Sequence, residues 1–360
     1  MARAFYLFVL YAWACTAACA EDGSQSSDHG VILVYHHVSE KTPASTSVSP
    51  AQFAAHLDYI EGHGYVVWPL SQLVDQLRNA KPIPDNVIAL TFDDAYQSIA
   101  SAAHPMLQRR GWPYTVFVNT ASVDAGHNPF LSWDQLRELV RDGVTIGNHS
   151  HKHAHLLARV PGASFEQHGI RVMADIQHAQ QRLHAELGLT PTLFAYPYGE
   201  YDATVSELVT DAGLTGFGQH SGAVGINSDF SSLPRFPMGG AYAGLDLLAT
   251  RLQTQPLYVQ ADPPGPLVLT GTDRSPWVAL ELARGPYDVA RLACYASGQG
   301  AMTLVREADP KKVRIAPQMP LAVGRSKFNC TVPHETREGV FFWWSYLVMT
   351  PGADGRWYEG

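Results

Sequence analysis

Short apolar runs alternate with amphipathic stretches from His29 to about residue 250. The apolar runs are rich in β-branched and aromatic residues and predict strands at 31–35, 65–68, 87–92, 115–119, 144–148, 193–197 and 216–218. Stretches with helical spacing lie between them and predict helices that begin at Pro50 with Ser49 as N-cap, and at 71–79, 95–110, 132–142, 165–187 and 204–212. This strand–helix rhythm repeats about seven times and predicts an α/β fold, a parallel sheet closed into a (β/α)7-type barrel.

The rhythm changes after about Arg251. Strand-like runs such as PLVLT, WVALELA, VARLACY and FFWWSYLVM follow, separated by Pro, Gly and Asp, with no convincing amphipathic helix. This pattern predicts a barrel over residues 30–252 and a second, smaller all-β, sandwich-like domain over 253–360. The aromatic cluster at 341–346 would pack the core of that domain, contact the barrel or form a platform for sugars.

The first 20 residues have the layout of a secretory signal: one Arg, an apolar run and then small residues. Residues 21–29 would follow as a polar tether. Cleavage after Ala20 competes with a lipobox that ends at Cys19, whose lipidation would attach the protein to a membrane. We therefore expect an exported protein, in the periplasm or as an outer-membrane lipoprotein, with secretion as the alternative.

The composition of the chain limits the classes of partner that the protein could bind. A chain with 46% hydrophobic and 16% charged residues is globular, and a net charge of −8 gives no basic stripe for a nucleic acid. Once Cys15 and Cys19 are assigned to the signal, Cys294 and Cys330 remain. They would form a disulfide in an oxidising compartment or stay as two buried free thiols.

Two adjacent carboxylates, Asp93 and Asp94, follow the most apolar predicted strand. In a barrel, this position presents them together at the mouth, where active residues lie. One acid can bind a cation while the other moves protons. Taken alone, the pair would equally suit the acidic N-terminus of a helix.

Four His in seven residues follow the strand at 144–148. His149 and His153 are four residues apart, so one helical turn would project both imidazoles to the same side. With Asp94 they would form a site of three protein ligands with room for water. His151 and His155 have the same spacing and are the rival pair, and a solvated His-rich loop is the remaining alternative.

The motifs TFDD (91–94), HSHKH (149–153) and AYPYG (195–199), in this order, resemble the polysaccharide deacetylases of carbohydrate esterase family 4 over about residues 30–250. The resemblance implies a distorted barrel, with Asp93 as the base and Asp94, His149 and His153 as metal ligands. It implies hydrolysis of N-acetyl groups on N-acetylglucosamine-containing polysaccharide. One divalent ion is expected, zinc first, with cobalt, nickel or iron tolerated. The backbone N–H near Tyr198 would help to hold the oxyanion.

The sequence departs from the family pattern at two places. Ala195 stands where the third motif usually has an Arg that orients the base, and Arg235 is our candidate replacement. The usual Leu-x-His segment with the general acid is absent near 230–250. His36 instead matches the acid of a circularly permuted branch, which is similar to the poly-β-1,6-N-acetylglucosamine deacetylases of biofilm export. Its neighbour His37 should point to the opposite side.

Three aromatic residues, Tyr198, Trp133 and Phe217, are candidates for stacking on a sugar, although each would also suit a core.

Two other functions compete with the deacetylase. A glycoside hydrolase needs two acids that flank the scissile bond, which adjacent carboxylates cannot do. A non-catalytic glycan-binding protein would be expected to have lost the base or a metal ligand. Biofilm polymer, other cell-surface glycans, peptidoglycan fragments and chitin remain candidate substrates.

Overall fold

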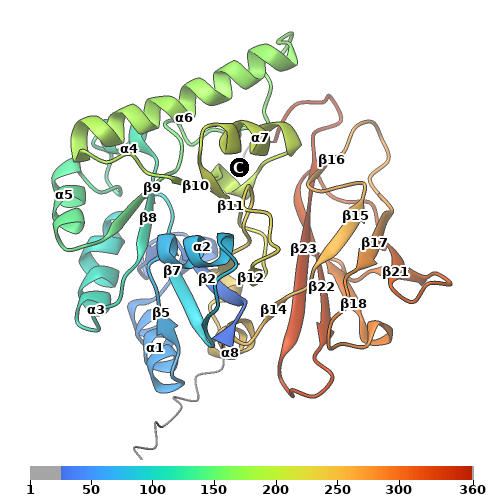
Figure 1. Cartoon of the computed structure of the whole chain (residues 1–360). Helices are drawn as coiled ribbons and strands as arrows, with labels where there is room; N and C mark the ends of the chain where they lie inside the picture. Colours follow the sequence, from blue (N-terminus) through green and yellow to red (C-terminus); the bar gives the residue numbers. More distant parts are fainter. Residues whose placement is uncertain (1–25, 359–360) are drawn as a thin grey trace, which may run out of the picture.

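The computed structural model describes residues 26–358 (Figure 1). The predicted signal peptide, Cys19 and most of the predicted tether lie outside the described residues. Within the described part of the chain, none of the helices combines the length and the apolar character needed to cross a bilayer.

A curled sheet of nine strands forms the larger part of the molecule. Its strand order is β11-β10-β9-β8-β7-β2-β12, with β5 added to β7 and β13 added to β2, and every pairing except β12–β2 is parallel. The strands are β2 (His29–Tyr35), β5 (Val66–Val67), β7 (Val87–Phe92), β8 (Thr115–Val118), β9 (Thr145–Asn148), β10 (Leu193–Ala195), β11 (Thr215–Phe217), β12 (Val224–Gly225) and β13 (Phe236–Pro237).

Residues 233–237 connect the two sides of this sheet. Leu233 pairs in parallel with Phe217 of β11, and β13 then pairs in parallel with β2. The sheet therefore curls as expected for the predicted barrel. Two small pairs lie outside it, β1 (Ser26–Ser27) with β6 (Ile83–Pro84) and β3 (His37–Val38) with β4 (Ser47–Val48).

Helices surround the curled sheet, as Figure 1 shows. They are α1 (Pro50–Gly62), α2 (Leu70–Arg78), α3 (His104–Gln108), α4 (Thr120–Asp124), α5 (Trp133–Arg141), α6 (Phe165–Leu187), α7 (Ala203–Asp211) and α8 (Leu245–Leu252). Ser49, Ser132 and Ser164 each form a capping box with the Gln three residues later, which fixes the starts of α1, α5 and α6.

The prediction of one helix over 95–110 is wrong at its start. Asp94 and Ala95 both have positive φ, so the chain cannot continue from β7 directly into a right-handed helix. A π-helix at Ile99–Ala103 leads instead into α3. The carboxylates that end β7 therefore belong to a loop.

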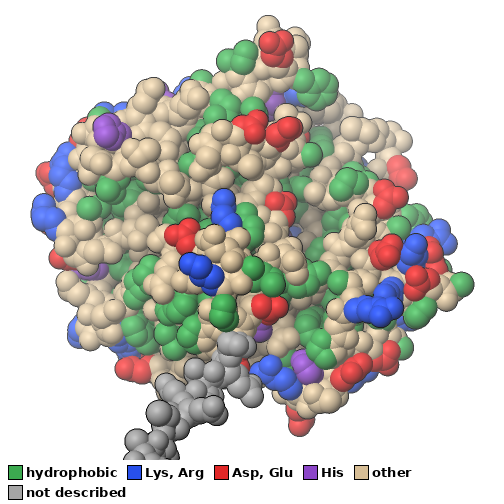
Figure 2. All heavy atoms as spheres, in the orientation of Figure 1, with side chains coloured by type: hydrophobic (Ala, Val, Ile, Leu, Met, Phe, Trp, Pro, Cys, Tyr) green, Lys and Arg blue, Asp and Glu red, His purple; other side chains and the backbone are tan. Residues whose placement is uncertain are grey.

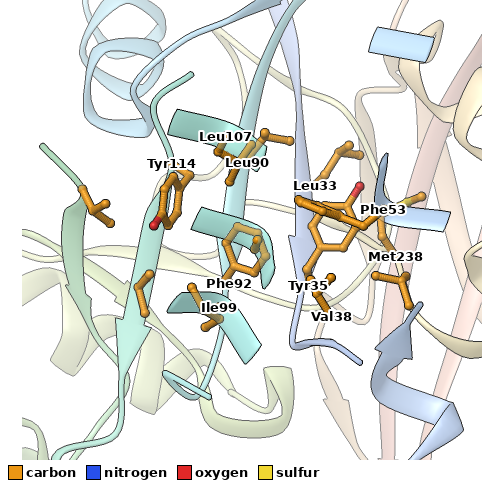
Figure 3. Close-up of a cluster of buried hydrophobic side chains, with 14 of the residues drawn as sticks. Leu33, Tyr35, Val38, Phe53, Leu90, Phe92, Ile99, Leu107, Tyr114 and Met238 are labelled. Carbon is orange, nitrogen blue, oxygen red and sulfur yellow. The ribbon is translucent and has the colours of Figure 1, made fainter. Parts of the chain in front are cut away.

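The largest apolar cluster lies beside β2, β7 and β8 (Figure 3). All six residues of β7 are buried, as expected for a parallel strand that is covered on both faces. The rings of Tyr35, Phe53 and Phe92 lie 5.1–5.9 Å apart, centroid to centroid. This core holds the carboxyl end of β7, and thus Asp93 and Asp94, in place.

Strands predominate after α8, and they form two sheets beside the barrel (Figure 1). One has the order β14-β23-β22-β18-β19 with β16 on β23, and the other has the order β15-β17-β21-β20. Cys294 and Cys330 pair across β18 and β22 and form a disulfide. The strands are β14 (Gln255–Pro256), β15 (Val259–Asp262), β16 (Leu267–Val268), β17 (Val278–Leu282), β18 (Ala293–Ala296), β19 (Gly300–Ala301), β20 (Thr303–Arg306), β21 (Lys312–Ala316), β22 (Gly324–Pro333) and β23 (Phe341–Thr350).

Strand β23 belongs to two cores at once. Phe342, Tyr346 and Val348 pack between the two C-terminal sheets. Leu347 and Met349 are instead buried in a cluster with residues of β10 and α7. Because alternate residues of a strand face opposite sides, one strand can serve both the C-terminal sheets and the barrel.

The aromatic cluster at 341–346 is divided in the same way. Trp343 packs edge-on against Phe236 of the barrel, with ring centroids 5.3 Å apart. Trp344 packs against the core between the C-terminal sheets. These contacts support the core and interdomain interpretations of the cluster rather than a sugar platform.

Charged side chains of both signs are interspersed over the face drawn in Figure 2. No continuous basic stripe crosses this face, which agrees with the net charge of −8.

Candidate active site

Three side chains meet beyond the carboxyl ends of β7 and β9. Nε2 of His149 lies 3.4 Å, and Nε2 of His153 3.1 Å, from Oδ1 of Asp94. One ligand atom from each residue lies within 4.8 Å of the others. A carboxylate and two imidazoles form a donor set that suits a divalent metal ion.

The surroundings of His149 test whether this trio fits a metal. Its Nδ1 lies 2.7 Å from the carbonyl oxygen of Ala195, which can only accept, so Nδ1 carries the proton. In a neutral imidazole Nε2 is then a lone pair, and it is buried without a hydrogen-bond partner among the described residues. A lone pair that faces the Asp94 carboxylate is favourable only with a cation or proton between them. The residues therefore fit a metal ion, and Ala195 orients one ligand.

The helical turn predicted for residues 149–153 is wrong. These residues form a loop in which Ser150 has φ 63° and His153 has φ 51°. The backbone N–H of His153 donates to Oγ of Ser150 at 3.1 Å, which closes the loop. Five of the seven described non-glycine residues with positive φ lie in the three motif loops, where backbone strain commonly marks function, namely Asp94, Ala95, Ser150, His153 and Tyr198.

The rival pair has other partners. Nδ1 of His151 lies 2.8 Å from Oγ1 of Thr120, and its ring stacks on His178. Nδ1 of His155 lies 2.8 Å from the buried carboxylate of Glu200. The geometry thus groups His149 and His153, not His151 and His155, with Asp94.

Asp93 is completely buried and is paired with Arg235. Nη1 and Nη2 of the guanidinium donate to its two carboxylate oxygens at 2.7 and 2.8 Å, and Nε donates to the carbonyl of Gly218 at 2.9 Å. Burial alone would raise the pKa of Asp93, but the charge of Arg235 outweighs it and holds the pKa below its usual value. Arg235 thus occupies the orienting position that Ala195 cannot fill.

His36 emerges directly after β2, on the side of Asp93. The link between them is Gln219, whose Nε2 lies 3.3 Å from Oδ2 of Asp93 and 3.5 Å from Nε2 of His36. His37 is buried and stacks on Tyr96 at 3.6 Å between ring centroids, so it packs away from that link. The structure therefore brings His36, and not His37, to Asp93.

Sequence analysis missed two side chains of this centre, Gln219 and Asn119. Nδ2 of Asn119 donates to Oδ1 of Asp94 at 3.2 Å. Asn119 directly follows β8, and Gln219 follows β11 by two residues. Their position after parallel strands was the signal that could have identified them.

The three aromatic candidates for contact with a sugar differ in burial and in their neighbours. Phe217 has no exposed surface and packs on Phe117 in the core, so the prediction that it stacks on a sugar is wrong. Tyr198 is partly buried, and its ring lies 4.6 Å from that of His153, a candidate metal ligand. The indole N–H of Trp133 donates to Asp124 on α4 at 2.9 Å, and its contact with substrate stays a prediction.

Arg235→Met should lower the free energy of unfolding by roughly 3–5 kcal/mol, because it leaves the Asp93 carboxylate buried without its partner. Urea unfolding followed by circular dichroism would measure the change. The matched control is Arg141→Met, since Arg141 pairs with Glu138 on the surface at 3.9 Å. The control should cost less than about 1 kcal/mol. Equal losses in the two variants would contradict a special role for the buried pair.

Residues 80–217 match the family model described as polysaccharide deacetylase. The Bacillus subtilis protein YxkH is 27% identical over 186 residues, which is 52% of this chain and 61% of that protein. The poly-β-1,6-N-acetyl-D-glucosamine N-deacetylase of Escherichia coli is 25% identical over 246 residues, which is 57% of this chain and 36% of the relative. The chain thus spans less than two thirds of either relative.

A solved structure shows the same fold. The Streptococcus pyogenes deacetylase PplD in complex with acetate aligns with a TM-score of 0.55 and 22% identity, over 62% of this chain and 98% of that one. The matched family region contains the TFDD, HSHKH and AYPYG motifs, whose side chains meet at one end of the curled sheet. Residues 80–217 therefore form a polysaccharide deacetylase domain that is similar to those of carbohydrate esterase family 4.

Proposed function

We propose that this protein is a metal-dependent polysaccharide N-deacetylase that hydrolyses the N-acetyl groups of N-acetylglucosamine units and releases acetate. One observation carries the proposal: Asp93, ionised and fixed by Arg235, lies next to the trio Asp94, His149 and His153. A base beside a metal-binding trio is what hydrolysis of an amide by activated water requires. The family match and the named relatives support it.

Asp94, His149 and His153 would hold the metal ion, for which zinc is the first choice and cobalt, nickel or iron are alternatives. When bound, a divalent ion would supply Lewis-acid chemistry there, since it would polarise the acetamide oxygen and lower the pKa of water. Asp93 accepts the proton of the attacking water, because its carboxylate is ionised and its orientation is set by Arg235.

The remaining roles follow from position. The imidazole of His36 gives a proton to the leaving nitrogen, so that the products are acetate and a free amine on the sugar. The backbone N–H of Tyr198, which has a left-handed conformation with φ 58°, helps to hold the oxyanion. The ring of Tyr198, beside His153, is the aromatic surface that would meet the sugar.

The first substrate to test is poly-β-1,6-N-acetylglucosamine, for which the Escherichia coli relative is named. The purified protein would be incubated with this polymer, with chitin oligosaccharides and with peptidoglycan fragments, each with zinc, cobalt or nickel. Acetate release that depends on the metal is the expected result. New reducing ends without acetate would identify a glycoside hydrolase, and binding without either product would identify a glycan-binding protein.

We also propose that the protein is exported, as a periplasmic or outer-membrane lipoprotein through Cys19 or as a secreted protein. The disulfide between Cys294 and Cys330 supports this, because such bonds persist in oxidising compartments. We assign residues 30–252 to a distorted (β/α)7-type barrel and residues 253–360 to an all-β, sandwich-like accessory domain. The two sheets that follow α8 support this division.

His36→Ala should lower kcat for acetate release by about 10²-fold with metal content unchanged, the lower end of the usual range for one acid–base group. The reason is that water can still protonate the amine, although poorly. Acetate would be measured enzymatically and metal by mass spectrometry. His37→Ala is the matched control and should keep most of the turnover, since His37 packs on Tyr96. A larger loss of turnover in His37→Ala than in His36→Ala would show that His36 is not the general acid.

A further inference from the structure

Strand β22 presents two cations to the barrel. Its alternate residues Phe328, Cys330 and Val332 are buried in the core between the C-terminal sheets. Because side chains alternate along a strand, Arg325 and Lys327 point to the other face, where the loops of the deacetylase domain lie. The C-terminal strands therefore contact the proposed centre with charged groups as well as with apolar ones.

Three side chains of β22 and β23 bond to main-chain carbonyls of the barrel loops. Nζ of Lys327 donates to the carbonyl of Gln219 at 2.6 Å, and Arg325 donates to the carbonyl of Tyr198. Oγ of Ser345 donates to the carbonyl of Ser221 at 2.5 Å. We call Arg325, Lys327 and Ser345 the carbonyl clamp.

Two of the three clamped residues touch the chemical groups of the centre. The side chain of Gln219 lies within 3.5 Å of both Asp93 and His36, and the ring of Tyr198 contacts that of His153. When the main chain of a residue shifts, its side chain shifts with it. A shift of either carbonyl would therefore move a group that contacts the base, the acid or a metal ligand.

The two clamped loops also pack directly on each other. Gly199 has φ 69°, and a Cβ at that position would lie 2.7 Å from Cβ and from the backbone nitrogen of Gln219. Such a distance leaves no room for any larger residue. The loop of Tyr198 and the loop of Gln219 are thus in direct contact, and β22 bonds to both from outside.

Stability alone is a weak explanation for a half-buried lysine at this place. Taking an ammonium out of water costs free energy, and an apolar residue of similar volume is often as stabilising or more so. Partial removal of its ammonium from water lowers the pKa of Lys327 to about 8. Fixing the carbonyl of Gln219 is the specific gain that the observed contact offers.

We propose that Lys327 and Arg325 are positioning residues of the deacetylase centre, by which the C-terminal sheet holds the loops of Gln219 and Tyr198 in register with Asp93, His36 and His153. This inference rests on the proposed deacetylase function. Displacement of a catalytic group by about 1 Å can cost up to about 10²-fold in rate, so a loosened loop should affect turnover strongly.

The test compares Lys327→Met, which keeps the aliphatic stem and removes the donor, with Lys327→Arg, which restores a donor. Lys312→Met on β21 is the matched control, since Lys312 is exposed and pairs with Glu281 at 3.5 Å. We expect kcat to fall by about tenfold or more in Lys327→Met, with KM and metal content close to those of the parent. Lys327→Arg should recover most of the loss, and Lys312→Met should equal the parent.

A second readout does not depend on turnover. Hydrogen exchange of the peptides that cover 196–199 and 218–221 should become faster in Lys327→Met, while the peptide at 328–332 should keep its protection. If the parent released no acetate, the proposed function would fail, and this exchange experiment would still decide whether the clamp exists. Two outcomes overturn the clamp: unchanged exchange with kcat within about twofold of the parent, or exchange that rises equally in all C-terminal peptides.

Discussion

Asp93→Asn should lower the turnover of acetate release by about 10⁴-fold, the upper end of what one acid–base group contributes. The amide cannot accept a proton, and it also breaks the two-bond pairing with Arg235 that orients the carboxylate. Metal content should stay that of the parent, because Asp93 is not one of the three residues that could bind the ion. Single-turnover acetate release and metal analysis of the same preparation would measure both quantities.

The control for this variant is Asp124→Asn, which alters a carboxylate that binds Arg182 and Trp133 on the outer helices. It should keep the turnover of the parent. Circular dichroism would verify that Asp93→Asn is folded. Turnover within about tenfold of the parent would show that Asp93 is not the base, since general-base catalysis contributes at least about 10².

His149→Ala should remove the metal and with it the activity. The residue supplies one of three protein ligands, and loss of a mere partner of a ligand already costs about 10–100-fold in affinity, so loss of the ligand itself should cost more. The alanine also leaves a cavity beside Asp94 at a fully buried position. Competition with a chelator would give the affinity, and the metal content after dialysis would give the occupancy.

His151→Ala is the control for the metal ligand. His151 is a histidine of the same loop as His149, but its ring lies against His178 and Thr120. It should therefore keep the metal of the parent, whereas His153→Ala should lose it like His149→Ala. Loss of metal from all three variants alike would mean that the whole loop, rather than the chosen pair, holds the ion.

The regular elements could be predicted because their signals are local. Helix α6 has the bounds that its apolar spacing predicts, and Ser164 with Gln167 marks its start in the sequence itself. The loop after β7 has no such signal, because the sequence does not mark Asp94 and Ala95 as left-handed residues. The loop of His153 escaped prediction for the same reason. The spacing of the histidines identified the candidate ligands of this loop, but it did not predict the backbone conformation between them.

The centre itself was predictable only in part. The residue types and their places after strands pointed to Asp93, Asp94, His149 and His36, since parallel strands bring their carboxyl ends together. Gln219 has no distinctive chemistry in a sequence, and the approach of β22 depends on which face of that strand meets the barrel. Lys327 lies 108 residues from the carbonyl that it binds, a separation at which no local pattern carries information.

Strand β23 limits how the gene can be divided. A protein that ended at Leu252 would lack Leu347 and Met349, and the apolar side chains of β10 and α7 that they cover would face water. An exposed apolar patch of this kind leads to aggregation. Recombination that exchanged the C-terminal strands for those of a distant relative would meet the same difficulty. The new strand in the place of β23 would have to pack on the apolar side chains of β10 and α7, with which it did not evolve. The barrel and the C-terminal strands are therefore expected to be inherited as one unit.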